Sequence, residues 1–302
     1  MLEFIVFALL SLNSHDIPMG QNIDVLPNIE ILELAKIPEK ATNRIAPKLL
    51  KNTQTAVLAM DLGSGKVLLS ERAHRSQPIA SVSKLMTALL ILENHELDEV
   101  VTVPIEATLV NSSTIDVYEY EQFTVGTLIE AILIGSANDA AVTLAVFHSG
   151  SEAEFVREMN ARAKELKLHS AKFYNSTGLD IMDEQQTEVW GNSMSAYDVL
   201  TLARILLQNP FVKEAVAKPH FYGTSVDGKF FHEKPTTNKL LSSFLNLKGM
   251  KTGFTYFAGE CFVALGETNG GDEVLTVILG SQDRFGETKK LISWIYDAFE
   301  WR

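Results

Sequence analysis

The chain has 302 residues, of which 46% are hydrophobic and 21% charged, a composition typical of a globular protein with one large core. Its formal net charge is −12, and it carries no basic cluster that could replace counterions along a phosphate backbone, so no nucleic acid partner is expected. The single cysteine, Cys261, excludes an intrachain disulfide and any metal site built from several cysteines. The seven histidines show no metal-ligand spacing, so the sequence predicts no metal site.

The first 52 residues differ from the rest of the chain. Residues 4–12 form an apolar run interrupted only by Ser11, too short to span a bilayer, and Glu3 stands where an export signal would carry Lys or Arg. We interpret this run as a weak or truncated export segment or membrane anchor, with a plain N-terminal arm as the alternative. Residues 13–52 contain four prolines and no sustained period, and we expect an extended arm on the domain formed by residues 53–302.

Segments near both ends of this domain predict β-strands. A glycine turn, Gly63-Ser64-Gly65, separates two apolar segments, which favours a β-hairpin, and three further strand-like segments follow near the C-terminus. The predicted strands are residues 55–61, 66–70, 246–255, 260–266 and 273–280. Because helices are predicted between them, the N-terminal hairpin and the C-terminal strands are expected to share one antiparallel sheet in an α+β fold.

Capping residues and apolar periodicity locate the helices. Ser151 with Glu154, and Ser195 with Asp198, have the spacing of helix-capping boxes. Pro210 is expected to stop the second of these helices, and the chain beyond it to form strands and loops. Further helices with buried faces are predicted at residues 85–92, 128–134, 139–147 and 287–299.

The only Ser-x-x-Lys sequence of the chain runs from Ser81 to Lys84 and leads into the first predicted helix. Residues three apart share a helix face, so the hydroxyl and the amine would lie side by side. A serine hydroxyl is a poor nucleophile, and a buried amine with a lowered pKa can take its proton at neutral pH. Ser81 is therefore the candidate nucleophile and Lys84 its base. A chain of this length should contain about one such sequence by chance, so the pair alone is a weak signal.

Two further tripeptides follow in order. Ser136-Ala137-Asn138 lies in a loop between predicted buried helices, and Lys251-Thr252-Gly253 lies on a predicted strand. With their flanks, at residues 79–87, 136–141 and 251–255, the three sequences resemble those of the D-alanyl-D-alanine carboxypeptidases, the low-molecular-mass penicillin-binding proteins. The resemblance extends from about residue 53 to the C-terminus.

This resemblance implies a β-lactamase/transpeptidase-like fold, in which an antiparallel sheet is covered by helices, a helical subdomain is inserted, and the active site lies in the cleft between them. It implies that residues 53–302 are a penicillin-binding catalytic domain that needs no metal or organic cofactor. The implied partners are peptidoglycan stem peptides and β-lactam antibiotics, and the implied location is extracytoplasmic. Since the chain ends at Arg302, soon after the closing helix, membrane attachment is expected only through the N-terminus.

The resemblance also assigns roles in catalysis. Ser81 would attack the carbonyl of the penultimate D-alanine, the terminal D-alanine would leave, and water would hydrolyse the acyl-enzyme. Lys84 would act as the base, Ser136 would relay a proton to the leaving amine, and Asn138 would hold Lys84 or the substrate amide.

The third motif would bind the substrate as an added strand. The charge of Lys251 and the hydroxyl of Thr252 suit a terminal carboxylate, and Gly253 lets the peptide approach closely. By resemblance, the backbone N–H groups of Ser81 and Phe254 form the oxyanion hole.

Several alternatives remain open at this stage. The family's Asn-x-Asn before the third motif appears as Thr236-Thr237-Asn238, and Arg284 matches a family position near the substrate carboxylate but equally suits a structural salt bridge. Glu188, four residues before Asn192, would suit the deacylating glutamate of a class A β-lactamase. A D,D-endopeptidase or transpeptidase would carry the same motifs, and a non-catalytic peptidoglycan-binding protein is the remaining reading.

Overall fold

The computed structural model describes residues 36–40 and 54–302. The apolar run at residues 4–12 and most of the predicted arm lie outside the described residues, so these interpretations and the predicted boundary after residue 52 stay predictions. Within the predicted arm, β1 (Pro38–Lys40) pairs antiparallel with β15 (Phe299–Trp301). No helix in the described ranges is both long and apolar enough to cross a membrane.

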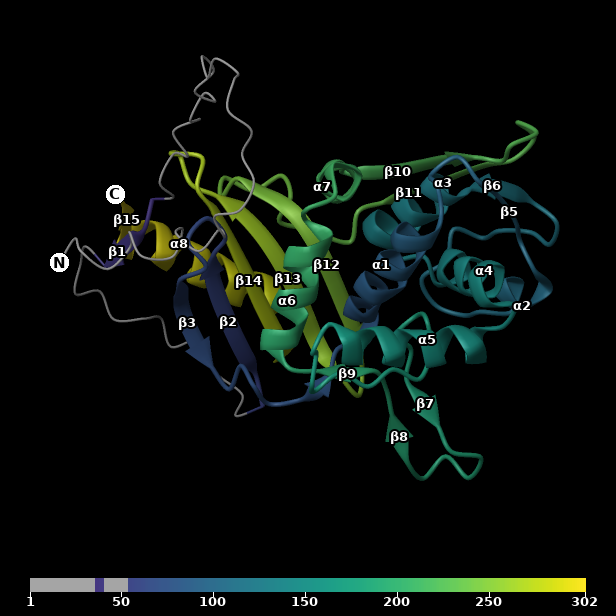
Figure 1. The fold of residues 1–302 in the computed structure, drawn as a ribbon, viewed down its shortest axis with the longest axis horizontal. Helices are drawn as coiled ribbons and strands as arrows, with labels where there is room; N and C mark the ends of the chain where they lie inside the picture. Colours follow the sequence, from purple (N-terminus) through teal and green to yellow (C-terminus); the bar gives the residue numbers. More distant parts are fainter. Residues whose placement is uncertain (1–35, 41–53) are drawn as a thin grey trace, which may run out of the picture. The chain divides into compact units, whose positions relative to one another are not determined.

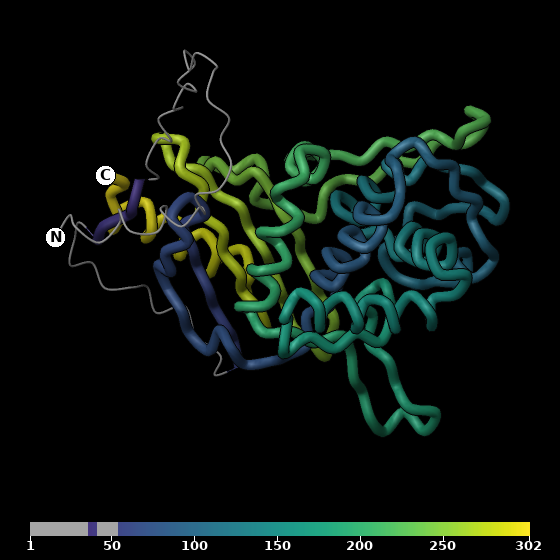
Figure 2. The backbone as a smooth tube through the Cα atoms, viewed as in Figure 1, coloured from purple at the N-terminus to yellow at the C-terminus, as the bar shows by residue number. Residues whose placement is uncertain are grey.

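A five-stranded antiparallel sheet contains the predicted N-terminal hairpin and all three predicted C-terminal strands (Figure 1). Its spatial order is β12 (Leu247–Thr255), β13 (Gly259–Glu267), β14 (Glu273–Ser281), β2 (Ala56–Asp61) and β3 (Val67–Glu71). The central pairing, between β14 and β2, joins segments more than 200 residues apart, as the tube in Figure 2 shows. The predicted α+β plan is therefore confirmed, and β12 is an edge strand.

Both faces of the sheet are covered, because side chains alternate along each strand. Val57 and Ala59 of β2 point toward α8 (Arg284–Ala298) and pack with its Leu291 and Ile295. The neighbouring residues of β2 belong instead to the large core on the opposite face, over which α6 (Ala196–Leu206) lies (Figure 1). The result is a sheet between α8 and the remaining helices.

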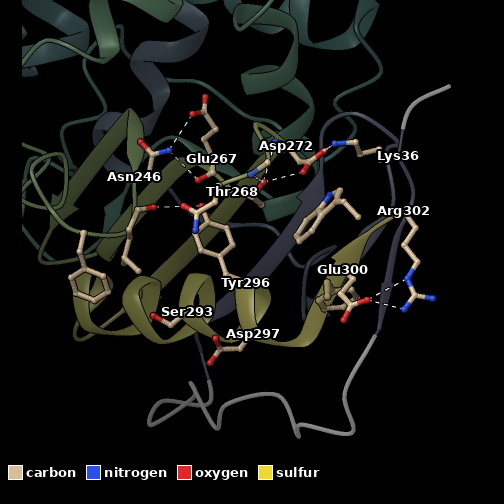
Figure 3. Close-up of a pocket in the computed structure, with 16 residues that line it drawn as sticks. Lys36, Asn246, Glu267, Thr268, Asp272, Ser293, Tyr296, Asp297, Glu300 and Arg302 are labelled. Atoms are coloured by element: carbon tan, nitrogen blue, oxygen red, sulfur yellow. Dashed lines mark hydrogen bonds and ion pairs between the residues drawn. The ribbon is translucent and has the colours of Figure 1, made fainter. Parts of the chain in front are cut away.

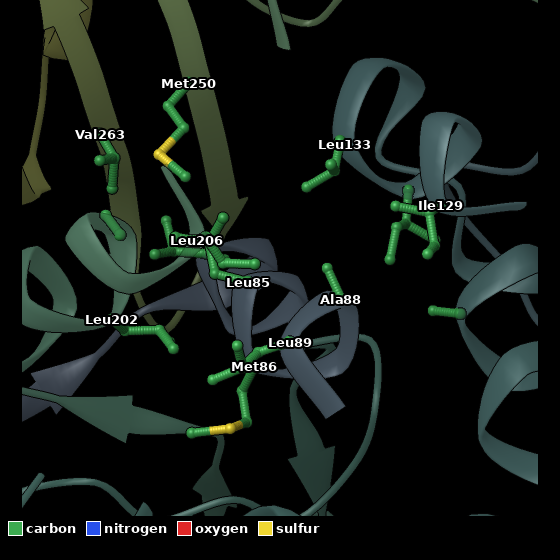
Figure 4. Close-up of a cluster of buried hydrophobic side chains, with 14 of the residues drawn as sticks. Leu85, Met86, Ala88, Leu89, Ile129, Leu133, Leu202, Leu206, Met250 and Val263 are labelled. Carbon is green, nitrogen blue, oxygen red and sulfur yellow. The ribbon is translucent and has the colours of Figure 1, made fainter. Parts of the chain in front are cut away.

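Helix α1 (Lys84–Asn94) is the centre of the helical part, and it follows a 3-10 turn, η1 (Ala80–Ser83). Residues 84–91 are all buried, as expected for a helix that is apolar on every side. Figure 4 shows Leu85, Ala88 and Leu89 of α1 between side chains from α6, β12, β13 and the helices that follow α1 in the chain. These helices are α2 (Ile105–Thr108), α3 (Val125–Glu130), the π-helical turn η2 (Ala131–Gly135), α4 (Asn138–Ser149) and α5 (Glu152–Glu165).

The predicted caps are present, but the prediction for Pro210 is wrong. Ser151 accepts a hydrogen bond from the backbone N–H of Glu154 at 3.2 Å, and Ser195 caps α6 in the same way. Helix α6 ends at Leu206 without the proline, and Pro210 begins a new helix, α7 (Pro210–Val216), capped by Asn209. Proline fits the first position of a helix, where its missing N–H has no partner to lose.

Short antiparallel pairs complete the described fold. One of them, the hairpin β7–β8, projects from the body in Figure 1, whereas the hairpin β10–β11 runs along the helical part beside η2. The short strands are β4 (Gln77–Pro78) with β9 (Ser193–Met194), β5 (Val100–Thr102) with β6 (Gln122–Thr124), β7 (Ile181–Met182) with β8 (Val189–Trp190), and β10 (His220–Thr224) with β11 (Phe231–Pro235).

Candidate active site

The nucleophile candidate lies on the short turn before α1. Ser81 belongs to η1 and Lys84 is the first residue of α1, so their side chains share a face as predicted. The Nζ atom of Lys84 lies 3.1 Å from Oγ of Ser81. The turn is closed by Ser83, whose hydroxyl donates to the carbonyl of Ala80 at 2.6 Å. The two groups are thus fixed within hydrogen-bond reach by local backbone geometry.

The amine of Lys84 has two further partners, and together they orient it. Nζ donates to Oδ1 of Asn138 at 2.7 Å and to the carbonyl of Thr177 at 2.6 Å. Neither oxygen can donate, so both hydrogens of a neutral amine are engaged there. Its lone pair is then free to accept the proton of the Ser81 hydroxyl, which is the third group in contact with it. This arrangement fits a general base.

The surroundings of Lys84 favour this neutral form. The side chain is fully buried, and burial is the largest cause that lowers its pKa from 10.5 to about 7. The charge of Lys234 on β11 lowers the pKa further, while the carboxylates of Asp139 and Glu152 act in the opposite direction. A sizeable share of Lys84 is therefore uncharged near neutral pH.

The second motif sits at the end of an irregular helix. The π-helical turn η2 ends at Gly135, and the next residue, Ser136, caps it with a left-handed backbone with φ of 60°. Such turns are frequent at functional sites. Asn138 is held from two sides, because its backbone N–H donates to the carbonyl of Ser113 at 2.7 Å and its Nδ2 donates to the carbonyl of Asn111 at 3.1 Å. In the part of the chain that the structure describes, the Ser136 hydroxyl has no hydrogen-bond partner, so it remains available to a ligand.

The third motif lies on the edge strand β12. The amine of Lys251 is buried and donates to the carbonyl of Thr252 at 3.0 Å. Its pKa is lowered well below 10.5, first by burial and then by the charges of Lys84, Arg284 and Lys234. The hydroxyl of Thr252 lies 2.6 Å from that of Thr237.

Two glycines let three chain segments meet at Ser81. A Cβ added to Gly253 would lie 3.0 Å from the backbone nitrogen of Ser81 and 2.9 Å from the carbonyl of Ile79. Gly178 has φ of +82°, and its added Cβ would lie 2.1 Å from the carbonyl of Ala80. The turn η1, which carries Ser81, therefore packs between β12 and the loop at residues 173–179. Only glycine fits at either contact.

Arg284 contacts the third motif, and within residues 36–40 and 54–302 it forms no salt bridge of the kind considered from the sequence. Its Nη1 donates to the carbonyl of Gly253 at 2.6 Å, and its backbone N–H donates to the carboxylate of Glu260 at 2.9 Å. Phe254 follows Gly253 and is 52% exposed, at the open end of the strand.

Among the described residues, no group of three or more His, Cys, Asp or Glu side chains is placed to hold a metal ion. His95 and His148 bond each other at 2.8 Å and pair with glutamates at their outer nitrogens. Cys261 is buried, and burial raises its pKa to about 11, which makes it a poor nucleophile.

A pocket of about 600 Å³ lies beside α8 (Figure 3). Tyr296 of α8, Glu267 of β13 and Thr268 line it, together with Lys36 and Trp301. None of the predicted site residues lines this pocket.

The structure thus brings the three motifs together, and it adds three groups that the sequence did not reveal. Lys234 is an unremarkable lysine in sequence, and its place near Lys84 depends on the β10–β11 hairpin. Thr237, rather than the doubtful position 236, contacts Thr252. The carbonyl of Thr177 has no side-chain signature, because any residue at that position would supply a backbone carbonyl. The roles of the predicted residues in catalysis stay predictions.

Comparison with known proteins identifies the family. A family profile described as D-alanyl-D-alanine carboxypeptidase matches residues 42–283. The chain is 32% identical over 281 residues to D-alanyl-D-alanine carboxypeptidase DacF of Bacillus subtilis. The matching region covers 88% of this chain and 67% of DacF. It is 29% identical over 245 residues to a D-alanyl-D-alanine endopeptidase of Escherichia coli, covering 80% and 76% of the two chains.

Solved structures agree with this result. Penicillin-binding protein D2 from Listeria monocytogenes, in its ampicillin-bound form, is similar with a TM-score of 0.66 and 32% identity, over 79% of this chain and 95% of that one. The predicted β-lactamase/transpeptidase-like fold is thereby confirmed. The chain spans 62 to 67% of the length of the first curated carboxypeptidases that it matches. By its sequence and its fold, the chain belongs to the D-alanyl-D-alanine carboxypeptidase family of peptidases.

Proposed function

We propose that this protein is a serine carboxypeptidase that removes the terminal D-alanine from peptidoglycan stem peptides. The observation that carries the proposal is the buried amine of Lys84, held 3.1 Å from the Ser81 hydroxyl with its two hydrogens engaged elsewhere. This pair lies against Gly253 of the edge strand β12, which can accept an extended peptide as a sixth strand.

In the proposed reaction, Oγ of Ser81 attacks the carbonyl carbon of the penultimate D-alanine while its proton passes to Nζ of Lys84. The backbone N–H groups of Ser81 and Phe254 stabilise the resulting oxyanion. The C–N bond then breaks, and the leaving D-alanine takes a proton by way of Ser136. Water hydrolyses the ester, which frees Ser81 and releases the shortened peptide. Lys251 and Thr252 bind the terminal carboxylate, and Arg284 braces their strand through the carbonyl of Gly253.

β-Lactams resemble the terminal dipeptide, and we propose that they acylate the same serine. The bound ampicillin of the Listeria relative supports this step. Since peptidoglycan lies outside the cytoplasm, we place the enzyme there. Attachment to a membrane through residues 4–12 is part of this proposal and is testable by cell fractionation of the full chain with and without those residues.

The β-lactamase alternative is disfavoured by the position of Glu188. This residue is exposed next to β8, and its backbone N–H donates to the side chain of Asp183 within the projecting β7–β8 hairpin (Figure 1). Asn192 is buried and bonds the backbone of Tyr174 and Asn175 instead. A carboxylate on an exposed hairpin is poorly placed to activate a deacylating water.

The test is incubation with a pentapeptide that ends in D-Ala-D-Ala, followed by mass spectrometry. We expect the loss of one alanine, and we expect Ser81→Ala to abolish both this loss and labelling by fluorescent penicillin while its thermal midpoint stays close to wild type. Labelling retained in Ser81→Ala would refute the assignment of the nucleophile. Preferred cleavage of a cross-linked dimer would indicate an endopeptidase, like the Escherichia coli relative. Nitrocefin turnover that is lost in Glu188→Gln would indicate a β-lactamase.

A further inference from the structure

Lys234 connects the β10–β11 hairpin to the second motif. Its Nζ donates to the hydroxyl of Ser113 at 2.8 Å and to the carbonyl of Thr114 at 2.6 Å. Ser113 in turn donates to the carbonyl of Gly135 at 3.0 Å, directly before Ser136. The aliphatic stem of Lys234 covers Gly135 so closely that an added Cβ there would lie 2.9 Å from Cδ of the lysine.

The segment that Lys234 holds is also the segment that holds Asn138. The carbonyls of Ser113 and Asn111 accept the two N–H bonds that fix Asn138, and Asn138 accepts a hydrogen from Lys84. A continuous chain of contacts therefore runs from Lys234 through the segment at residues 111–114 to the amine of the catalytic base.

Lys234 also places a positive charge near that base. The partners of its Nζ are a hydroxyl and a carbonyl, and although burial lowers the pKa of Lys234 from 10.5, the carboxylates of Asp139 and Asp116 act in the opposite direction and favour its charged form. Its charge lowers the pKa of both Lys84 and Lys251. A methylene stem alone could cover Gly135, and a hydroxyl alone could bond Ser113, but only a cation can act in this way on the two buried lysines.

We propose that Lys234 is a positioning residue for acylation, which clamps the segment at residues 111–114 onto the Ser136–Asn138 loop and supplies a fixed positive charge beside Lys84. The proposal rests on the proposed function. It assigns a role to a residue outside the three motifs, on a hairpin that carries none of them.

The charged groups around Lys84 decide what the loss of Lys234 should do. Lys234 from β11 opposes protonation of Lys84, whereas Asp139 from α4 and Glu152 from α5 favour it. Lys251 from β12 is itself coupled to Lys84. Removing the charge of Lys234 leaves the two carboxylates less opposed, so the pKa of Lys84 should rise.

The test is the rate of acylation by a fluorescent penicillin, measured from pH 5.5 to pH 10 for wild type, Lys234→Met and Lys234→Gln. Because the amine must be neutral to act, the rate should rise with pH through the pKa of Lys84. If that pKa rises by one unit, the neutral fraction at pH 7 falls from about one half to about one tenth, a loss of about fivefold that disappears at high pH. The glutamine variant keeps a donor for Ser113, which guards against a methionine variant that fails to fold.

Three control variants separate charge from packing. Lys234→Arg keeps the charge, and its midpoint of the pH profile should stay near that of wild type. Ser113→Ala removes the clamp but not the charge, and it should lower the rate without moving the midpoint. Lys229→Met removes an exposed charge from the tip of the same hairpin, where Lys229 pairs with Asp227. It should change neither the rate of acylation nor the midpoint of the pH profile.

The outcomes are distinct from those that test the proposed function. If wild type is never labelled by penicillin, the proposed function fails before Lys234 is tested. If wild type is labelled and both neutral variants keep its midpoint, Lys234 does not act on Lys84 and the inference is overturned. A uniform loss at every pH, with an unchanged midpoint, would likewise reduce Lys234 to structural support and overturn it.

Discussion

Replacing Lys84 by methionine should abolish activity and at the same time remove a pH-dependent cost to stability. Methionine has a similar length and is uncharged, and the site is completely buried. The pKa of Lys84 falls from 10.5 to about 7 in the folded protein, so the unfolded chain binds more protons between these values. The free energy of unfolding of wild type should therefore rise with pH across this window. The destabilising contribution of Lys84 should be largest below pH 7.

The expected magnitude follows from this shift. A lowering of about 3.5 units corresponds to about 5 kcal/mol over the whole window, of which about 2 kcal/mol falls between pH 7 and pH 9. Methionine also leaves the oxygens of Asn138 and Thr177 without their donor, at about 1–3 kcal/mol each, but this cost does not depend on pH. The slope against pH, and not the absolute stability, is thus the quantity to measure.

Urea unfolding of wild type and Lys84→Met at pH 7, 8 and 9 measures that slope. Wild type should gain about 2 kcal/mol relative to the variant across this range. Coupling to Lys251 acts in the same direction. In the variant, the pKa of Lys251 is no longer lowered by the charge of Lys84, so Lys251 contributes less to the pH dependence of the variant than to that of wild type. If the two stabilities run parallel from pH 7 to pH 9, the folded protein keeps Lys84 charged, and its role as the base is refuted.

Two further substitutions test how the site is built. Thr252→Val deletes the hydroxyl that lies 2.6 Å from that of Thr237. We expect kcat/KM for the pentapeptide to fall at least tenfold while the free energy of unfolding falls by only about 1 kcal/mol. Unchanged kinetics would show that Thr252 is not part of the site. Gly178→Ala should cost more than about 2 kcal/mol and slow acylation by penicillin, because the new Cβ would press on the carbonyl of Ala80. Gly228→Ala is its control, since Gly228 also has positive φ (+73°) but open space around it, and equal losses in both variants would show that backbone strain alone is responsible.

The sequence predicted the sheet and the nucleophile turn because both follow from local patterns. Residues 56–60 are an unbroken apolar run, which suits a strand buried on both faces, and in β2 successive side chains face the larger core and α8 in turn. Likewise, a spacing of three residues is enough to place Ser81 beside Lys84 on one helical turn. Pro210 misled the prediction, since the same residue stops one helix or starts the next according to whether a capping side chain such as Asn209 precedes it.

The environment of the base could not be read in this way, because tertiary contacts create it. Lys84, the proposed base, is buried and contacts Asn138 of α4 and the loop at residues 173–179, while the charge of Lys234 on β11 acts on it, and each of these arrives from a different part of the chain. The carbonyl of Thr177 is a backbone atom that any residue would supply, so what the sequence specifies is Gly178, which alone permits the loop to press against Ala80. Lys234 is the converse case, a side chain whose identity matters but whose position only the hairpin reveals. The motifs therefore name the reacting groups, while the glycine and the lysine outside them set the distance and the charge at which those groups can react.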